Sequence, residues 1–112
     1  MATISLPWPD PKLSPNARTH WAVKSRYTRD QRTLARVMAQ RTLPPPMVDG
    51  KLSLRITFRP PDRRARDLDN MLASCKAYLD GISDAYGVND ARFVLTLERG
   101  EPVKGGCVEV WI

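Results

Sequence analysis

The chain has little of what secreted, membrane-spanning or zinc-binding proteins require. It contains two cysteines and one histidine, and Cys75 and Cys107 lack the close spacing of a zinc or redox site, so we expect free thiols. No apolar run approaches the roughly 20 residues that cross a bilayer. The start of the chain, where Ile4, Leu6 and Trp8 alternate with polar residues and proline, is unlike a signal peptide. We therefore expect a cytoplasmic protein with no membrane segment.

Internal repeats and low-complexity tails are also missing. At 112 residues the chain is long enough to bury one core and too short to form two domains. Its apolar fraction of 42% is close to that of ordinary globular proteins. We therefore expect one folded domain that spans residues 1–112.

Positive charge is present in excess and is unevenly distributed. Residues 1–60 carry eleven Lys or Arg and three Asp or Glu, whereas residues 61–112 carry seven and nine. The first half therefore has the character of a surface that binds a polyanion, and acids gather in the second half. A well-solvated basic surface with no partner remains the alternative.

Apolar and polar residues alternate in four segments, which predicts four β-strands. The segments are residues 2–8, 51–59, 92–98 and a last short one that contains Val108, Val110 and Ile112. The first runs into proline-rich chain, which is typical of an edge strand. A helical connection permits the second and third strands to be parallel, and the short link to the fourth predicts a hairpin.

Two main helices are predicted from apolar residues at three- and four-residue spacing. The first begins at the capping-box pair Thr28 and Gln31, after an irregular stretch over residues 9–26, and stops before prolines 44–46. The second runs from Asp69 to about Ile82. Their apolar faces comprise Leu34, Val37 and Met38, and Leu72, Cys75, Leu79 and Ile82. Together the elements predict an α+β fold, a mixed sheet of about four strands with both helices packed against it.

Residues 62–70, which read Asp-Arg-Arg-Ala-Arg-Asp-Leu-Asp-Asn, combine arginines with closely spaced acids. On extended chain Asp67 and Asp69 share one face at roughly 6–7 Å, and Asp90 joins them if the neighbouring strands lie side by side. Mg²⁺ prefers such oxygen ligands, and a bound Mg²⁺ ion can support hydrolysis of a phosphodiester. Mn²⁺ is the alternative ion. The pattern therefore predicts a metal site formed by these three carboxylates.

Basic residues complete the predicted site. Lys76 lies two helical turns after Asp69, and helical side chains lean towards the N-terminus, so we expect it to stabilise charge on the phosphate. The remaining candidates are arginines on a helix, a strand and the loop before the acids. The candidate residues for binding a polyanion, DNA if the resemblance described below holds, are Arg29, Arg32, Arg36, Arg55, Arg59, Arg63, Arg64 and Arg66.

Each of these residues also has a plainer interpretation. Asp67 or Asp69 can cap a helix, Asp90 can belong to a turn, and Lys76 can be a solvated lysine. The arginines of residues 63–66 can act as a solubilising loop or as counter-ions to nearby acids. His20 fits a hydrogen-bonded loop residue better than a catalytic base. The three tryptophans fit packing roles, although an exposed Trp21 could stack on a base.

The sequence resembles the RusA-type Holliday junction resolvases, a family common in phages and prophages. The resemblance extends over most of the chain and is most specific at residues 62–70 with the spaced Asp90. Four further segments support it: Leu6-Pro7-Trp8-Pro9 matches the family's N-terminal strand and proline turn, and Lys104-Gly105-Gly106 precedes its final strand. The other two are Leu79-Asp80-Gly81-Ile82 and residues 87–93.

The resemblance implies a homodimeric, Mg²⁺-dependent endodeoxyribonuclease that nicks symmetric strands of a four-way DNA junction in recombination and repair. It assigns the three catalytic aspartates to Asp67, Asp69 and Asp90. Family members often carry a catalytic lysine four residues after the second aspartate, and here that position is Ala73. Lys76 is the nearest replacement.

Three functional hypotheses follow. The first is the junction endonuclease, whose two-fold dimer suits the near two-fold symmetry of a junction. The second is a non-catalytic or degenerate DNA-binding protein of the same fold, which the alanine at residue 73 favours. The third is a metal-dependent nuclease that acts on single strands or RNA. Paired, metal-dependent nicking distinguishes the first from the others.

Overall fold

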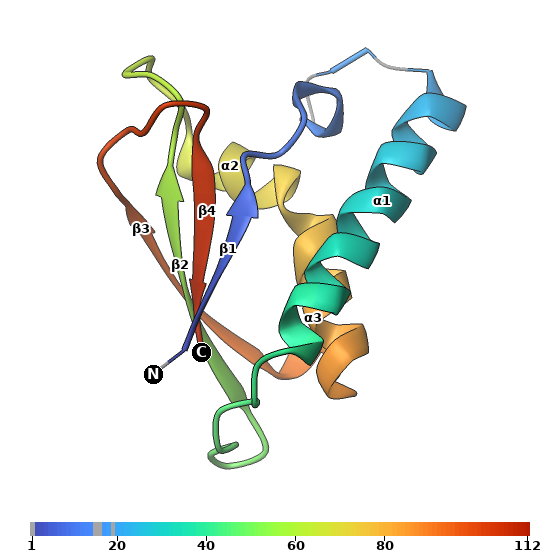
Figure 1. The fold of residues 1–112 in the computed structure, drawn as a ribbon, viewed down its shortest axis with the longest axis vertical. Helices are drawn as coiled ribbons and strands as arrows, with labels where there is room; N and C mark the ends of the chain where they lie inside the picture. Colours follow the sequence, from blue (N-terminus) through green and yellow to red (C-terminus); the bar gives the residue numbers. More distant parts are fainter. Residues whose placement is uncertain (1, 15–16, 19) are drawn as a thin grey trace.

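Four strands form one mixed sheet, and the helices lie against one of its faces (Figure 1). The computed structural model describes residues 2–14, 17–18 and 20–112, without the side chain of Lys12. This arrangement confirms the predicted α+β domain, with three α-helices in place of two. In chain order the elements are β1 (Thr3–Pro7), η1 (Pro11–Leu13), α1 (Trp21–Gln40), β2 (Leu52–Arg59), α2 (Leu68–Ser74), α3 (Lys76–Tyr86), η2 (Asp90–Arg92), β3 (Phe93–Arg99) and β4 (Cys107–Trp111).

The hydrophobic core lies between this sheet and the helices. Strand alternation places every second side chain on the covered face, and the register aligns them: Ile56 lies opposite Leu97 on one side and Val110 on the other. The helices add Tyr78, whose hydroxyl donates to the Pro7 carbonyl at 2.7 Å and links α3 to the end of β1. The fully buried strand residues are Ile4, Leu6, Leu52, Leu54, Ile56, Phe58, Val108 and Val110.

The strand order is β1-β4-β2-β3, which makes two topological predictions right and a third wrong. β2 and β3 are parallel, as expected, and β1 is an edge strand. β4, however, does not form a hairpin with β3; it lies antiparallel between β1 and β2. Val108 and Val110 of β4 are almost fully buried, and the central position provides apolar neighbours on both sides.

The link from β3 to β4 therefore crosses the end of β2. The Gly100 amide donates to the Phe58 carbonyl and the Val103 amide to the Pro60 carbonyl. Gly106 has a positive φ of 70°, and a Cβ there would lie 2.9 Å from the Trp8 Cβ. This position favours glycine because the backbone is left-handed and the space is closed.

α1 begins at Trp21, seven residues before the predicted start. His20 occupies the N-cap, and its Nδ1 accepts from the Ala22 amide at 3.3 Å, in keeping with the expected hydrogen-bonded role. The capping-box prediction is wrong, because the Thr28 hydroxyl instead donates to the Lys24 carbonyl inside the helix at 2.8 Å. Residues 21–26 are consequently helical, where irregular chain was predicted.

The second predicted helix is divided at Cys75 into α2 and α3. The Cys75 amide donates to the Leu72 carbonyl at 3.0 Å, a tighter turn than an α-helix makes. Three- and four-residue spacing is compatible with either arrangement, so the sequence did not distinguish them. α3 continues to Tyr86 and ends at Gly87, whose φ is 64°. The helix therefore extends four residues beyond the predicted end at Ile82, and Gly81 lies inside it.

Both cysteines are free thiols, as predicted, and burial raises the pKa of Cys75 to about 12. Among the helices that the structure describes, none is both long and apolar enough to cross a membrane.

Candidate active site

Two of the predicted metal ligands stand at the start of α2. Asp67 is extended (φ −77°, ψ 135°) and occupies the N-cap, but its carboxylate makes no capping hydrogen bond. Asp69 lies in the first helical turn, so only the first of the two acids is on extended chain as expected. Asn70 contacts both: its backbone N–H donates to Asp69 Oδ1 at 3.0 Å, and its side-chain Nδ2 donates to Asp67 Oδ2 at 3.4 Å. The two carboxylates therefore lie around one asparagine.

The arginine loop, residues 62–66, leads into this acid pair and is held by its own side chains. Arg66 Nη1 lies 2.9 Å from Asp62 Oδ1 and donates to the carbonyls of Asp62 and Arg64 at 3.2 Å. The hydrogen bond from Arg66 lowers the pKa of Asp62. Arg99 Nη1, from the end of β3, donates to the Arg66 carbonyl at 2.7 Å. These contacts fix the backbone immediately before Asp67.

The counter-ion interpretation of these arginines holds for Asp62 and not for the acid pair. Arg64 and Arg66 pair with Asp62, and Arg63 lies 3.3 Å from Glu101. Within the described part of the chain, Asp67 and Asp69 have no Lys, Arg or His within ion-pair distance. Their charge is therefore compensated by no neighbouring side chain there.

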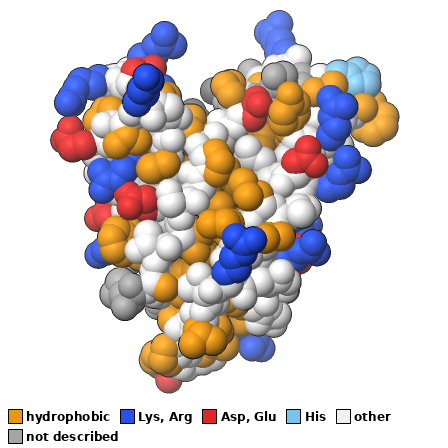
Figure 2. Space-filling model, viewed as in Figure 1, with side chains coloured by type: hydrophobic (Ala, Val, Ile, Leu, Met, Phe, Trp, Pro, Cys, Tyr) orange, Lys and Arg blue, Asp and Glu red, His pale blue; other side chains and the backbone are white. Residues whose placement is uncertain are grey.

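A cleft of about 440 Å³, which we call the tryptophan cleft, opens beside Asp67. The Arg66 guanidinium lies over the Trp8 ring, 5.7 Å from its centroid. In Figure 2 the molecule is hollowed at its upper end, and Lys and Arg side chains lie on both sides of the hollow. The cleft is lined by Trp8, Pro9, Asp10, Pro11, Ser14, Ala65, Arg66, Asp67, Asn70, Met71 and Ser74.

The other two predicted catalytic residues meet at a different place. Lys76, the first residue of α3, donates to Asp80 at 2.8 Å and also to Asp90 Oδ2. The hydrogen bonds that Lys76 donates to Asp80 and Asp90 raise the pKa of Lys76, and the bond from Lys76 lowers the pKa of Asp90. Lys76 is thus paired rather than simply solvated, and Asp90 belongs to its cluster.

A second cleft, which we call the lysine cleft, lies beside Lys76 and shares one lining residue with the tryptophan cleft. Lys24 and Thr28 of α1 line it together with Ala73, Ser74, Lys76, Ala77, Asp80 and Leu13, around about 260 Å³. Ser74 lines both clefts, and α2 spans roughly 10 Å from the acid pair to this point. Ala73 and Lys76 therefore face the same space.

The donor chemistry of the acid pair suits Mg²⁺, which is commonly held by one or two carboxylates with waters and substrate phosphates. Three converging carboxylates are not seen: among the described residues, no three His, Cys, Asp or Glu side chains are grouped closely enough to hold one ion. Asp67 and Asp69 come together, and Asp90 is instead held by Lys76. The three-carboxylate site remains a prediction.

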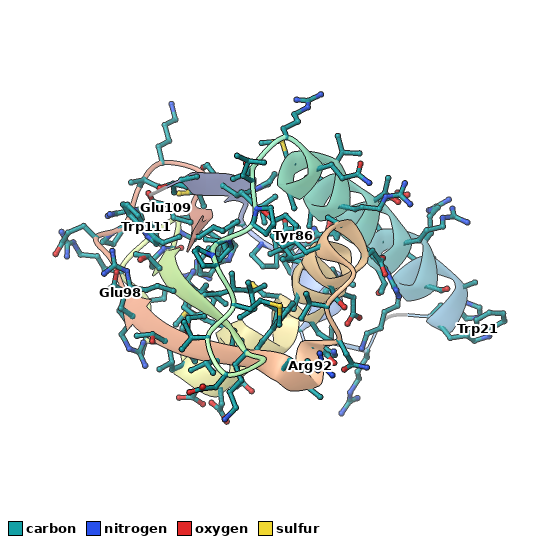
Figure 3. The ribbon with its side chains drawn as sticks, turned by 90° about the horizontal axis from the view of Figure 1, so that it is seen from below. Trp21, Tyr86, Arg92, Glu98, Glu109 and Trp111 are labelled. Carbon is teal, nitrogen blue, oxygen red and sulfur yellow. The ribbon has the colours of Figure 1, made fainter. Side chains whose placement is uncertain are left out.

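The remaining candidate arginines lie on other surfaces. On α1, Arg29 and Arg36 are exposed, and Arg32 binds Asp84 of α3 through two hydrogen bonds of 2.6 and 2.8 Å. On the uncovered face of the sheet, Arg55 lies over Trp111 and Arg59 pairs with a glutamate. Figure 3 shows Glu98, Glu109 and Trp111 on this side, away from the helices; Glu98 lies 3.7 Å from Arg55, and Glu109 bonds Arg59.

Three residues of the site were missed by sequence reasoning. Asn70 belongs to residues 62–70, which were singled out, and its position one residue after Asp69 and three after Asp67 could have indicated that it contacts both acids. Lys24 and Arg99 gave no local signal, because each reaches the site from an element that is distant in sequence.

Comparison with known proteins provides a relative but no function. No protein-family model matches the sequence. A protein of Xylella fastidiosa (strain Temecula1), named only as an uncharacterized protein, is 49% identical over 100 residues. The match covers 84% of this chain and 63% of that relative. The chain thus spans less than two thirds of the relative's length, and the function has to be argued from the site.

Proposed function

We propose that this protein is a Mg²⁺-dependent endonuclease that cuts branched DNA by paired nicks, with the four-way junction as its main substrate. The observation that carries the proposal is the grouping of Asp67 and Asp69 around Asn70, directly after the arginine loop. Carboxylates that form no ion pair with any described residue, beside a surplus of guanidinium groups, suit a metal ion and a phosphate at adjoining positions. The resemblance to RusA-type resolvases supports the same chemistry.

Each residue of the site has a separate role in this proposal. Asp67 and Asp69 would hold the ion, and Mg²⁺, when bound, would neutralise phosphate charge and activate a water. Arg63 and Arg64, with exposed guanidinium groups, bind the flanking phosphates. Lys76 lies two residues beyond the end of α2 and stabilises negative charge on the reacting phosphate. Two copies related by a two-fold axis account for paired cuts.

The test is nicking of a synthetic four-way junction with and without Mg²⁺. We expect symmetric nicks in Mg²⁺, weaker or altered nicking in Mn²⁺ and none in EDTA. Asp69→Asn and Asp67→Asn should abolish nicking, because each removes a metal ligand. Junction binding in EDTA should be retained or tightened, since a negative charge facing phosphate is lost.

Asp49→Asn is the matched control. It makes the same chemical change at an exposed acid in the turn before β2, and its φ of 53° is one that asparagine tolerates well. This variant should nick at the parental rate. Parental nicking by Asp67→Asn or Asp69→Asn would show that the catalytic assignment is wrong.

A second candidate function, DNA binding without cleavage, is favoured by Ala73, where the family often has a lysine. It predicts salt-sensitive junction binding and no metal-dependent products. If the natural chain does not nick and Ala73→Lys does, the protein is a degenerate member of the same fold.

A further inference from the structure

We infer that the tryptophan cleft binds a single unpaired nucleobase of the DNA, next to the phosphate that faces Asp67. The inference rests on the proposed function, in that it assumes a DNA substrate at the acid pair. It adds a recognition site for a base to a surface otherwise expected to contact phosphates. It also gives a physical reason for a preference for branched DNA.

The size of the cleft suits one nucleotide and not a duplex. Its volume of about 440 Å³ falls in the range of roughly 300–1,000 Å³ that is typical of sites for small organic ligands. A base inside a duplex is stacked between its neighbours and cannot enter such a space. A base that has left the stack can enter it.

The walls of the cleft are suited to a flat aromatic ring. Trp8 is partly buried against the core and offers an indole ring. The Arg66 guanidinium lies over that ring and is fixed by its contacts with Asp62 and Arg64. Aromatic rings and guanidinium planes are the groups on which unstacked bases are bound. Because both are held in place before DNA arrives, little side-chain freedom is lost on binding.

The polar end of the cleft can bind the edge of a base. One N–H of the Asn70 amide is used by Asp67, and the amide has a second N–H and an oxygen. An amide with one donor and one acceptor can pair with a base edge. Asp67 lines the same cleft, so a base held here belongs to the nucleotide at the proposed cutting site.

The other two tryptophans lie in different surroundings. Trp21 is 75% exposed at the start of α1, and Trp111 is on the uncovered sheet face with Arg55. Neither lines the tryptophan cleft. Trp8 is therefore the tryptophan whose position connects base stacking with the acid pair.

The inference accounts for branch preference through the energy of unstacking. Removing a base from a stack costs least where the base is mismatched or already unpaired. A strand at a branch point can present such a base, whereas a linear duplex has to be opened first. The same cleft would therefore favour a branched or unpaired site without reading its sequence.

The test compares two junctions that differ by one base. One carries a single unpaired thymine at the branch point, and the other carries an abasic residue there with the same backbone and charge. Binding is measured by anisotropy in EDTA, so that no cleavage is needed. We expect the junction with the base to bind at least about fivefold more tightly, as base–aromatic stacking implies.

Variants assign the effect to the cleft. Trp8→Ala should reduce the base-to-abasic affinity ratio to about one, and Trp8→Phe should retain most of it. Trp21→Ala, which removes an exposed ring elsewhere, should leave the ratio unchanged. Because the parental ratio is informative by itself, the test does not depend on Trp8→Ala being well folded.

Two outcomes would overturn the inference: a parental ratio near one, or a parental ratio that is kept in Trp8→Ala. Either result leaves the nuclease proposal intact if nicking is metal-dependent. Conversely, if the protein binds the junction with the base more tightly but never nicks DNA, the base-binding inference stands and the nuclease proposal is wrong.

Discussion

Ala73 and Lys76 line the same cleft, so a lysine side chain from either position enters the same space. We therefore expect Lys76 to perform the function of the lysine that RusA-type resolvases often carry at the position matching Ala73. Lys76→Ala should lower junction nicking by about 100-fold, the effect of losing one group that stabilises transition-state charge. Adding Ala73→Lys to that variant should recover part of the rate.

Single-turnover nicking in Mg²⁺ measures this effect. Lys51→Ala is the control, because Lys51 is an exposed lysine in the turn before β2. A Lys76→Ala protein that nicks at the parental rate would leave Lys76 as a surface ion pair with Asp80 and Asp90. Failure of Ala73→Lys to restore activity would show that the two positions are not equivalent.

The Arg32–Asp84 pair makes stability depend on pH. The hydrogen bonds from Arg32 lower the pKa of Asp84 in the folded protein, whereas an unfolded aspartate titrates near 3.9. The pair therefore stabilises the fold fully above about pH 4, and this contribution is lost as the pH falls through the lowered folded pKa. Asp84→Asn should reduce the melting temperature at pH 7 and have a smaller effect at pH 2.

Thermal unfolding followed by circular dichroism at several pH values tests this prediction. Asp30→Asn is a suitable control, since Asp30 is exposed and lies 4.0 Å from Arg29. Equal effects of Asp84→Asn at pH 7 and pH 2 would mean that the charge of Asp84 contributes nothing. The pair also implies that Arg32 stabilises the α1–α3 contact, which makes it a weaker candidate for binding DNA than its exposed neighbours.

At the scale of elements, α1 and α3 approach each other closely at Gly81. A Cβ at this position would lie 2.3 Å from the Arg32 carbonyl oxygen and 2.9 Å from the Ala35 Cβ. Ala35 and Ala39, both fully buried, form the facing side of α1. Small residues on both helices therefore allow a contact that larger side chains would prevent.

Gly81→Ala should destabilise the protein by about 1–3 kcal/mol or more, as overpacking does. At a solvent-exposed position inside a helix, replacing glycine with alanine would stabilise the protein by up to about 1 kcal/mol. A net loss of stability therefore identifies the contact between α1 and α3 as its cause. Urea unfolding measures the difference. Gly50→Ala is the comparison, because a Cβ there meets no atom and only the positive φ of 72° opposes it. Unchanged or increased stability of Gly81→Ala would show that the helices can separate without cost.

These elements also show what local sequence can predict. Alternation located all four strands, because a half-buried strand repeats every two residues. The apolar face of α1 was predicted only in part. Met38 packs against the core as expected, but Leu34 is 37% exposed, and the fully buried positions are Ala35 and Ala39. The position of β4 was missed because neither the length nor the pattern of its link identifies the neighbouring strand.

In the site, too, local groupings could be predicted from the sequence and long-range contacts could not. The pairing of Asp67 with Asp69 follows from two positions in one short segment. The attachment of Asp90 to Lys76 and of Arg99 to the arginine loop joins residues 14 and 33 positions apart. Such contacts depend on how α3 and β3 return to the sheet, which single-sequence patterns do not specify.

For the molecule as a whole, the arginines are divided among different surfaces. The arginine loop adjoins the acid pair, whereas Arg55 and Arg59 lie on the uncovered sheet face beside glutamates. If a duplex arm binds at the acid pair as proposed, it would reach the loop more directly than the sheet face. We expect the loop to provide most of the phosphate contacts and most of the salt dependence of binding.

Arg64→Gln should reduce the slope of log affinity against log salt by about 1, the loss of one phosphate contact. Arg55→Gln should change the slope much less, because the Arg55 guanidinium is already engaged by Glu98 and the Trp111 ring. Junction binding in EDTA at a series of salt concentrations gives both slopes. Equal reductions by the two variants would mean that DNA also contacts the uncovered sheet face, and that a junction arm extends around the molecule rather than lying across the acid pair alone.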